Sequence, residues 1–454
     1  MSDGLTPTQD ELWLLPLGGC GEIGMNLNLY GHNGRWLMVD CGVTFNKTID
    51  HGGVIGKAKH QILSADPQFI ASRRQLLDGL IITHAHEDHI GAVAHLWRQF
   101  KCPVYTSAFT AEVLRRKLAE QGLIDRVPIH IIDPSQVYEI GVFKVSWVPL
   151  THSIPEPFGL VIQTQAGKVF HTADWKLDSH PVIGTPYSPE VYDHVGERAI
   201  DAMVCDSTNA KEEGWSISEG ALFDGLYQCI KQQTGRVVVG CFGSNVARLM
   251  TLCKVANQTG RYVGVLGRSL ENMVSCAKQA GVWPEEYEIA PASHMGYLPK
   301  EEVLLIATGS QGEPRTALYR LAHHNHYALE LDADDTVIFS SRVIPGNERD
   351  VELLINRFNQ SKVNVIQAGD TELPIHASGH PHQDELKAMY RWIKPRIAIP
   401  VHGEQAHLQA NGELAKSIGI KHQLIGENGD IFQIAPLPGI RRQVVRTGRI
   451  ELAR

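Results

Sequence analysis

The stretch His84-Ala85-His86-Glu87-Asp88-His89 places three imidazoles and the carboxylate of Asp88 within six residues. Residues 80–83 before it are apolar and β-branched, which predicts a buried strand. Apolar residues follow it at helical spacing, which predicts a helix after residue 89. We therefore expect the six residues on a strand-to-helix loop, where their side chains can meet in one cleft. The alternative is a histidine-rich surface turn, and it is disfavoured because ligand-type residues recur downstream in similar contexts.

Length and composition narrow the class of protein. A chain of 454 residues is too long for one ordinary core, and its 43% hydrophobic and 20% charged residues are typical of a globular protein. The formal net charge of −8 does not favour nucleic-acid binding by bulk charge, although a cleft can be locally basic. With 22 histidines, the chain has many imidazoles for its length, as a metal-dependent hydrolase would.

Neither end of the chain nor its cysteines indicate export. The sequence has no apolar run of eighteen residues, so no contact with a membrane is expected. The polar, acidic N-terminus does not resemble a secretory signal. Eight scattered cysteines with no Cys-x-x-Cys pair indicate reduced, buried thiols and not a cysteine-held zinc. We expect a cytoplasmic protein.

The pattern of predicted strands and helices changes twice along the chain. In residues 1–210, predicted strands repeatedly end on a polar or ligand-type residue, as at Asp40, His152, Asp174 and Asp206. Residues 211–372 repeat a strand-loop-helix pattern, which builds a parallel sheet covered by helices. In residues 373–454 the first pattern returns, with a strand that leads to His402. The simplest interpretation is an α/β protein whose second domain, 211–372, is inserted into the first.

These residues can form two metal sites. His152 and Asp174 can complete a site with His84 and His86. A second site can combine Asp88, His89, Asp174 and His402, with Asp174 as the bridge. Imidazole and carboxylate ligands favour two divalent ions, zinc first, with manganese or magnesium as alternatives. A metal pair about 3.5–4 Å apart can clamp both oxygens of a phosphoryl transfer and lower the pKa of a water to about 7.

The His84-x-His86-x-Asp88-His89 motif, together with the later acids and histidines, resembles the metallo-β-lactamase superfamily. The resemblance implies an αββα sandwich and the ligand set given above. It also implies that Asp40 orients a ligand and does not bind metal itself.

A narrower resemblance covers most of the chain. Three stretches look like the extra motifs of the β-CASP nucleases: 205–209 (Cys-Asp-Ser-Thr-Asn), 378–380 (Ser-Gly-His) and 401–404 (Val-His-Gly-Glu). Four others are similar to the ribonuclease J family: 18–26, 242–245, 308–314 and 344–348. This resemblance implies hydrolysis of single-stranded RNA, from 5′ to 3′, with preference for a 5′-monophosphate, and with endonuclease action as a further activity.

Several residues are expected to act on RNA directly. Asp88 can hold the attacking hydroxide. His380 is the candidate for proton donation or for gripping a phosphate oxygen, and Asp206 is expected to orient it. Ser378 and Gly379 lie beside His380, where backbone N–H groups suit phosphate.

A second expected phosphate contact lies at the start of a predicted helix. Ser244 and Asn245 precede this helix and Arg248 lies one turn on, so free N–H groups and the helix dipole can attract an anion. The alternative is simple N-capping by Ser244. Residues 308–312 form a similar loop, which either cradles phosphate or is a structural turn.

Two other functions compete with a ribonuclease. One is a DNA nuclease or another hydrolase on the same scaffold, and the other is a catalytically silent RNA-binding scaffold subunit. The complete ligand set argues against the second. The chain stops at Arg454 without the further C-terminal domain usual in this family. The oligomeric state of the protein is therefore left open, and a homodimer is one of the oligomeric states that we expect.

Overall fold

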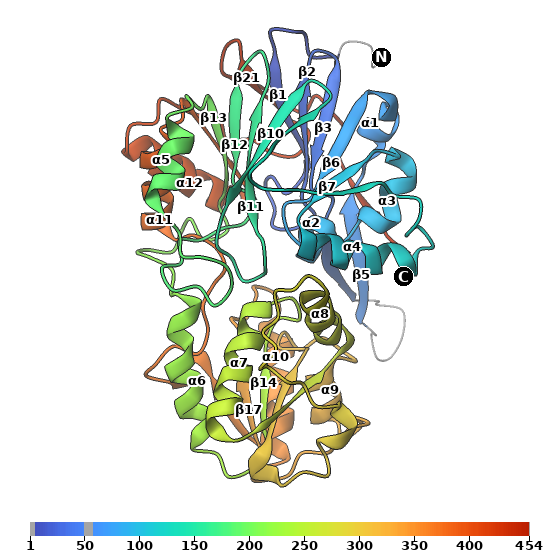
Figure 1. Cartoon of the computed structure of the whole chain (residues 1–454), viewed down its shortest axis with the longest axis vertical. Helices are drawn as coiled ribbons and strands as arrows, with labels where there is room; N and C mark the ends of the chain where they lie inside the picture. Colours follow the sequence, from blue (N-terminus) through green and yellow to red (C-terminus); the bar gives the residue numbers. More distant parts are fainter. Residues whose placement is uncertain (1–4, 50–57, 454) are drawn as a thin grey trace.

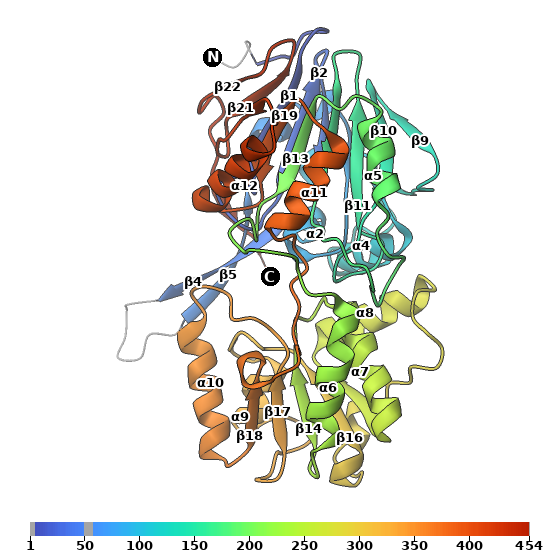
Figure 2. The same cartoon turned by 90° about the vertical axis from the view of Figure 1, so that its left-hand side faces the viewer.

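The computed structural model describes residues 5–49 and 58–453. The chain forms two lobes that are stacked along the long axis (Figures 1 and 2). One lobe, which we call the metal lobe because it carries the predicted metal ligands, contains two large sheets. The other, which we call the insert lobe, contains a five-stranded sheet built only from strands between residues 237 and 367. Both large sheets also include strands from beyond residue 373. The insert lobe thus interrupts the metal lobe, and the boundaries at 210/211 and 372/373 stay a prediction.

The first large sheet has the strand order β22-β21-β1-β2-β3-β6-β7-β8. Strands β3, β6, β7 and β8 pair in parallel, so their carboxyl ends meet at one edge. The strands are β1 (Leu12–Gly18), β2 (Leu27–His32), β3 (Arg35–Val39), β6 (Leu77–Ile81), β7 (Val104–Thr106), β8 (Ile129–Ile131), β21 (Ile431–Ala435) and β22 (Gly439–Arg441). At that edge, Asp40 follows β3 and the segment 84–89 follows β6.

The second large sheet has the order β20-β19-β13-β12-β11-β10-β9. Strands β11 and β12 form an antiparallel hairpin, and β12, β13 and β19 pair in parallel. Asp174, Asp206 and His402 come at or just after the ends of these parallel strands, at one edge. The strands are β9 (Val137–Ile140), β10 (Phe143–Pro149), β11 (Phe158–Gln163), β12 (Lys168–His171), β13 (Ala202–Asp206), β19 (Ile397–Val401) and β20 (His422–Gln423).

The two sheets face each other across a shared apolar core that includes Leu14, Val39, Ile162, Val204 and Ile399. Helices cover the outer faces, so strands such as β1 and β13 are buried on both sides, which explains their unbroken apolar sequences. The covering helices are α1 (Gln68–Ala71), α2 (Glu87–Ile90), α3 (Val93–Phe100), α4 (Ala108–Glu120), α5 (Pro189–Gly196), α11 (Gln383–Ile393) and α12 (Gln405–Ser417). This confirms the expected αββα sandwich.

The insert lobe is a fully parallel sheet of order β15-β16-β14-β17-β18. Its strands are β14 (Val237–Gly240), β15 (Tyr262–Leu266), β16 (Val303–Ala307), β17 (Thr336–Phe339) and β18 (Asn364–Gln367). Its helices are α6 (Leu222–Lys231), α7 (Val246–Thr259), α8 (Arg268–Gln279), α9 (Ala317–Ala322) and α10 (Glu348–Gln360). The predicted strand-loop-helix pattern and the parallel sheet covered by helices are therefore confirmed.

A small sheet of order β23-β5-β4 completes the described elements. Its strands are β4 (Val43–Ile49), β5 (Ala58–Ala65) and β23 (Arg449–Glu451). Short 3₁₀ turns lie at Arg74–Leu76, Glu219–Ala221, Ala292–His294, Lys300–Glu302 and Ala368–Asp370.

Candidate metal centre

Asp40 lies just after β3, and its carboxylate orients the neighbouring loop of residues 84–89. The residue is fully buried and adopts a left-handed backbone conformation, with φ of 63°. Its Oδ1 accepts a hydrogen bond of 2.8 Å from the backbone N–H of Thr83, and its Oδ2 lies 2.7 Å from Nδ1 of His89. This contact leaves Nε2 of His89 as the ring nitrogen available to a metal ion, which is the orienting role that the resemblance implies.

His84, His86, His152 and Asp174 form the first group of potential ligands. Nitrogen atoms of the three rings converge, since Nε2 of His84 lies 3.1 Å and Nε2 of His152 lies 3.0 Å from Nδ1 of His86. Oδ2 of Asp174 lies 3.7 Å from Nε2 of His84. All four residues offer a ligand atom within 4.8 Å of one another. This is the first set that the sequence predicts.

Asp88, His89, Asp174 and His402 form the second group, again with ligand atoms within 4.8 Å of one another. Oδ1 of Asp174 lies 2.9 Å from Nδ1 of His402 and 3.2 Å from Nε2 of His89. Oδ2 of Asp88 lies 3.2 Å from Nε2 of His402. Asp174 thus lies between the two groups, in the bridging position that the sequence predicts.

Burial and charge give the two groups different protonation. Burial lowers the pKa of His84 and His152 well below its usual value, and that of His86 to about 4. These rings are therefore neutral near pH 7 and keep a lone pair. Burial also lowers the pKa of His89 and His402, but the surrounding carboxylates, Asp174 foremost, together outweigh burial and hold the pKa of both rings well above the usual value. The second group is thus a place of negative potential.

Two further observations indicate that the side chains of the two ligand groups can bind divalent metal ions. Oδ1 of Asp174 and Nε2 of His402 are both buried, and among the described residues neither has a partner with hydrogen-bond geometry, although each lies within 3.2 Å of another ligand-type atom. Buried polar atoms are normally hydrogen-bonded, so close ligand-type atoms that are not bonded to one another fit a shared ion. Imidazole nitrogen and carboxylate oxygen are the atoms that zinc accepts. His84, His86, Asp88, His89, His152, Asp174 and His402 would hold the metal.

His380 and Asp206 lie at the rim of the same centre. Nδ1 of His380 lies 2.7 Å from Oδ2 of Asp206, and the side chain of His380 is 22% exposed. Burial lowers the pKa of His380, but the carboxylates of Asp206 and Asp174 outweigh it and raise the pKa. Asp206 is fully buried at the end of β13 and also accepts hydrogen bonds from Thr208. His380 is thus oriented with its Nε2 free.

Ser378 and Gly379 support the centre in a way that the sequence did not predict. The carbonyl oxygen of Gly379 lies 2.6 Å from Nδ1 of His152. Ser378 Oγ accepts hydrogen bonds from Asn209 Nδ2 and from the backbone N–H of His380. These contacts place the return connection from the insert lobe directly against the ligands.

Arg248 does not have the exposed position that RNA contact requires. Its side chain is fully buried and forms a bidentate ion pair with Glu219, with Nε 2.7 Å from Oε1. Its Nη1 donates to the backbone oxygen of Ser340. The expected substrate contact of Arg248 is therefore wrong, because its N–H groups are already bonded within the insert lobe.

The start of α7 also differs in detail from the prediction. Asn245, and not Ser244, is the N-cap, and its side chain accepts a hydrogen bond from the backbone N–H of Arg248. Ser244 is partly exposed, and Asn245 is buried. The backbone N–H of Ala247 donates to the carbonyl oxygen of Ser153, next to His152, so this end of α7 contacts the metal lobe.

Two features of the chain that contribute to the centre were missed at the sequence level. Asn26 lies in the glycine-rich stretch 18–26 and contacts Asp88 and His89. Lys117 of α4 forms an ion pair with Glu87 inside the ligand motif. The glycines around Asn26 were the available signal, because a run of them marks close backbone approach.

Family models match the chain in three places. They are the Beta-lactamase superfamily domain over residues 35–213, the Ribonuclease J, beta-CASP domain over residues 234–358, and the Zn-dependent metallo-hydrolase RNA specificity domain over residues 374–424. A crystal structure of a protein of unknown function from Enterococcus faecalis shares the fold, with a TM-score of 0.62, 14% identity, and coverage of 93% of this chain and 100% of that one. Fold and site together define a metal-dependent hydrolase of the metallo-β-lactamase fold with a β-CASP insertion.

Named relatives narrow this class. The chain is 42% identical to Ribonuclease J of Sinorhizobium meliloti, over 94% of this chain and 75% of that protein. It is 36% identical to Ribonuclease J of Mycolicibacterium smegmatis, over 91% of this chain and 73% of that protein. The chain belongs to the ribonuclease J family. Among the described residues, no helix is long and apolar enough to cross a membrane.

Proposed function

We propose that this metal-dependent ribonuclease uses two divalent ions to hydrolyse single-stranded RNA from 5′ to 3′, with preference for a 5′-monophosphate end and with endonuclease action as a second mode. Zinc is the proposed metal, with manganese and magnesium as alternatives. The observation that carries the proposal is the position of Asp174, which belongs to each group of converging ligand atoms around the centre.

The two proposed ions differ in their ligands. His84, His86, His152 and Asp174 would hold one, and Asp88, His89, Asp174 and His402 the other. When bound, such a pair supplies positive charge to the phosphate oxygens and lowers the pKa of a water.

Residues of the chain then orient the reaction. The side chain of Asp88 is 29% exposed, so its carboxylate can accept a hydrogen bond from the attacking water. Asp206 holds the Nδ1 of His380, which turns Nε2 of that ring outward. We propose that His380 gives a proton from Nε2 to the leaving oxygen of the RNA. This assigns Asp206 the task of keeping His380 in the correct tautomer.

The insert lobe offers a place for the 5′ end. Loops after β14, β16 and β17 leave the same edge of its parallel sheet, and they carry Ser244, Ser310 and Ser341. A pocket of about 200 Å³ at this edge is lined by Ser310, Ser341 and Arg342, among others. Hydroxyl and guanidinium groups are suited to a terminal phosphate. A pocket that holds a terminal phosphate would favour RNA with a 5′-monophosphate end.

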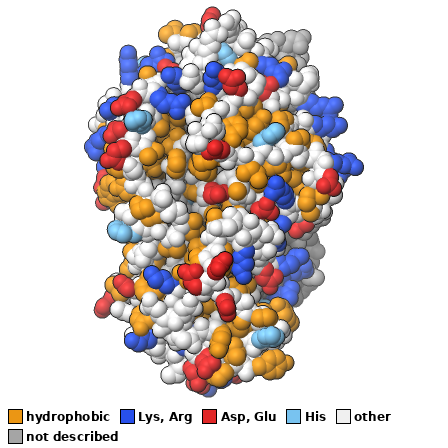
Figure 3. Space-filling view, viewed as in Figure 1, with side chains coloured by type: hydrophobic (Ala, Val, Ile, Leu, Met, Phe, Trp, Pro, Cys, Tyr) orange, Lys and Arg blue, Asp and Glu red, His pale blue; other side chains and the backbone are white. Residues whose placement is uncertain are grey.

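Other observations support RNA as the partner. One matched domain is described as an RNA specificity domain, and the named relatives are ribonucleases. Figure 3 shows basic and acidic side chains interspersed over one face, so this face has no uniformly basic surface and the proposal does not rely on binding by bulk charge. The proposal also places the protein in the cytoplasm and includes a homodimer, which light scattering tests.

The test is digestion of one labelled RNA that carries a 5′-monophosphate, a 5′-triphosphate or a 5′-hydroxyl, with a DNA of equal sequence alongside. We expect mononucleotides from the monophosphate RNA and little product from the other substrates. Asp88→Ala and His86→Ala are expected to lower the rate by on the order of 100-fold or more while the fold survives. Full activity of either variant, or of enzyme stripped of metal by a chelator, would contradict the two-metal mechanism. Digestion of DNA alone would contradict the proposal that RNA is the substrate.

A further inference from the structure

A glycine-rich loop, residues 18–26 between β1 and β2, touches both sides of the second ligand group. On one side, the backbone N–H of Asn26 donates to the carbonyl oxygen of Asp88 over 2.9 Å. On the other side, the carbonyl oxygen of Gly19 accepts a hydrogen bond of 2.6 Å from the backbone N–H of His402. Gly21 also forms an isolated parallel bridge with Glu404. The loop therefore connects segments that carry ligands more than 300 residues apart.

The side chain of Asn26 is directed at the ligands themselves. It is 3% exposed, and its Nδ2 donates to the carbonyl oxygen of Asp88 over 3.1 Å and lies 3.1 Å from Nε2 of His89. The loop allows little freedom for this side chain, because a Cβ atom on Gly19 would lie 2.2 Å from Oδ1 of Asn26. Asn26 is therefore held between Gly19 and the Asp88–His89 pair.

The backbone of Asp88 is enclosed from a second direction as well. The N–H of Gly42 donates to the carbonyl oxygen of Asn26 over 2.9 Å. A Cβ atom on Gly42 would lie 1.7 Å from the carbonyl oxygen of Asp88, so these segments are in closest contact. Asn26 and Asp88 are therefore coupled through the backbone hydrogen bond between them and the close packing around it.

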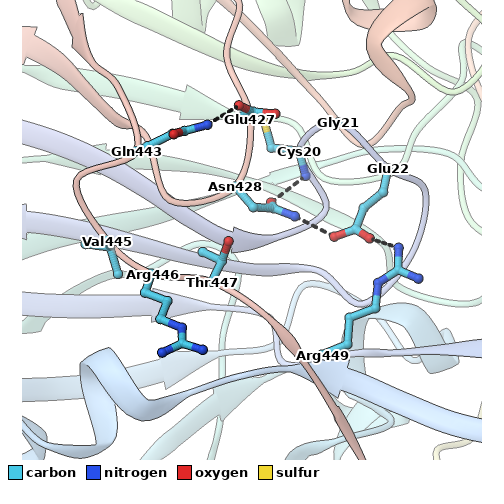
Figure 4. Close-up of a pocket in the computed structure, with 10 residues that line it drawn as sticks. All are labelled: Cys20, Gly21, Glu22, Glu427, Asn428, Gln443, Val445, Arg446, Thr447 and Arg449. Carbon is cyan, nitrogen blue, oxygen red and sulfur yellow. Dashed lines mark hydrogen bonds and ion pairs between the residues drawn. The ribbon is translucent and has the colours of Figure 1, made fainter.

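The outer side of the loop is held by a polar network in a pocket of about 530 Å³ (Figure 4). Glu22 forms an ion pair with Arg449 and accepts a hydrogen bond from Asn428. Oδ1 of Asn428 in turn accepts from the backbone N–H of Cys20 over 3.0 Å. Residues near the end of the chain thus brace the loop that carries Asn26.

We propose that Asn26 is a positioning residue, which sets the place of Asp88 and His89 relative to His402 and thereby the affinity of the second metal site. The inference rests on the proposed function, because it takes these residues as metal ligands. Removal of residues that orient ligands commonly weakens metal binding by roughly 10- to 100-fold. Asn26→Ala should therefore weaken one metal site by this factor and leave the first group, which Asn26 does not touch, close to its original affinity.

The test measures metal binding directly. Zinc and manganese dissociation constants are determined on the purified full chain by competition with a chromophoric chelator, for the original protein, Asn26→Ala and Asn26→Leu. The leucine keeps most of the side-chain volume but removes the donor. The matched control is Asn28→Ala, because Asn28 is also buried but no described residue forms a hydrogen bond with its Oδ1. We expect weakening of one site in both Asn26 variants and none in the control. Affinities equal to those of the original protein in the Asn26 variants would overturn the inference.

A second measurement needs no variant and covers the case in which the Asn26 substitutions prevent folding. Hydrogen exchange of residues 18–26 is compared in metal-free and metal-saturated protein. Because coupling is reciprocal, metal binding should slow exchange in this loop at least several-fold. Unchanged exchange in metal-saturated protein would also overturn the inference. A chain that binds no metal at all would instead contradict the proposed function, so the two failures are distinguishable.

Discussion

The carbonyl oxygen of Gly379 lies 2.6 Å from Nδ1 of His152, although the two residues are 227 positions apart. This contact turns Nε2 of His152 toward His86 in the first ligand group. Because Gly379 lies on the chain that returns from the insert lobe, the two lobes are coupled at a ligand. Gly379 was expected to offer its N–H to phosphate, and the structure gives its carbonyl a different task.

Gly379→Ala should lower activity at least about tenfold, since altered support of a metal ligand commonly costs this much. A Cβ atom at this position would lie 2.6 Å from Cε1 of His152 and would push the ring out of place. RNA hydrolysis rates and metal content check this. Gly439→Ala is the control, because its Cβ atom would meet nothing within 4 Å and it does not line the pocket proposed for the 5′ phosphate. Equal rates for the two variants would contradict the prediction.

Asp174→Asn should remove metal from both sites, because Asp174 belongs to both ligand groups and the amide lacks the negative charge. We expect less than one bound ion per chain by elemental analysis and a loss of RNA hydrolysis on the order of 100-fold or more. Asp193→Asn, at an exposed position of α5, controls for the general effect of the substitution. Two ions bound to Asp174→Asn would exclude a shared ligand.

Arg248→Ala should destabilise the protein and should not act as a loss of substrate contact. The substitution leaves the carboxylate of Glu219 buried without its partner, which typically costs about 3–5 kcal/mol. Thermal unfolding and RNA affinity are measured together, with Lys144→Ala as the comparison. Lys144 is 58% exposed at an ion pair with Glu139, so its loss should change stability by less than about 1 kcal/mol. Unchanged stability of Arg248→Ala would show that the buried pair is not important.

The buried thiols should not react with alkylating reagents in the native protein. Burial raises the pKa of Cys102 and Cys205 to about 12, so neither forms the reactive thiolate at pH 8. Cys229 is the one partly exposed cysteine of the eight. Iodoacetamide at pH 8 should therefore label Cys229 before all others, and every cysteine should react after unfolding in urea. Mass spectrometry of peptides reads the sites, and early labelling of Cys205 would contradict the burial.

The strand-helix repeats of the insert lobe could be predicted because apolar periodicity is local. Strand β14 is followed by α7, and β17 by α10, as the strand-loop-helix pattern of residues 211–372 predicts. The order of the five strands could not be predicted in this way, because it depends on which strands pair across long connections.

Arg248 shows where local reasoning about the site ends. Its distance from Ser244 predicted a helix position one turn in, and the structure agrees. Whether that position faces RNA or a buried Glu219 depends on the 3₁₀ turn at Glu219–Ala221, which packs against α7 from 29 residues away. No local pattern contains that information.

The sequence by itself determined the chemistry that is available to this protein. Imidazole and carboxylate groups follow strand ends, and their spacing defines a set of potential metal ligands because donor type is a property of each residue. Only the tertiary structure decided which atoms of these residues meet and that Asn26 and Gly379 brace them. The physical reason is that sheet pairing and close backbone packing bring together residues that are hundreds of positions apart, and hydrogen-bond distances of about 3 Å depend on that packing.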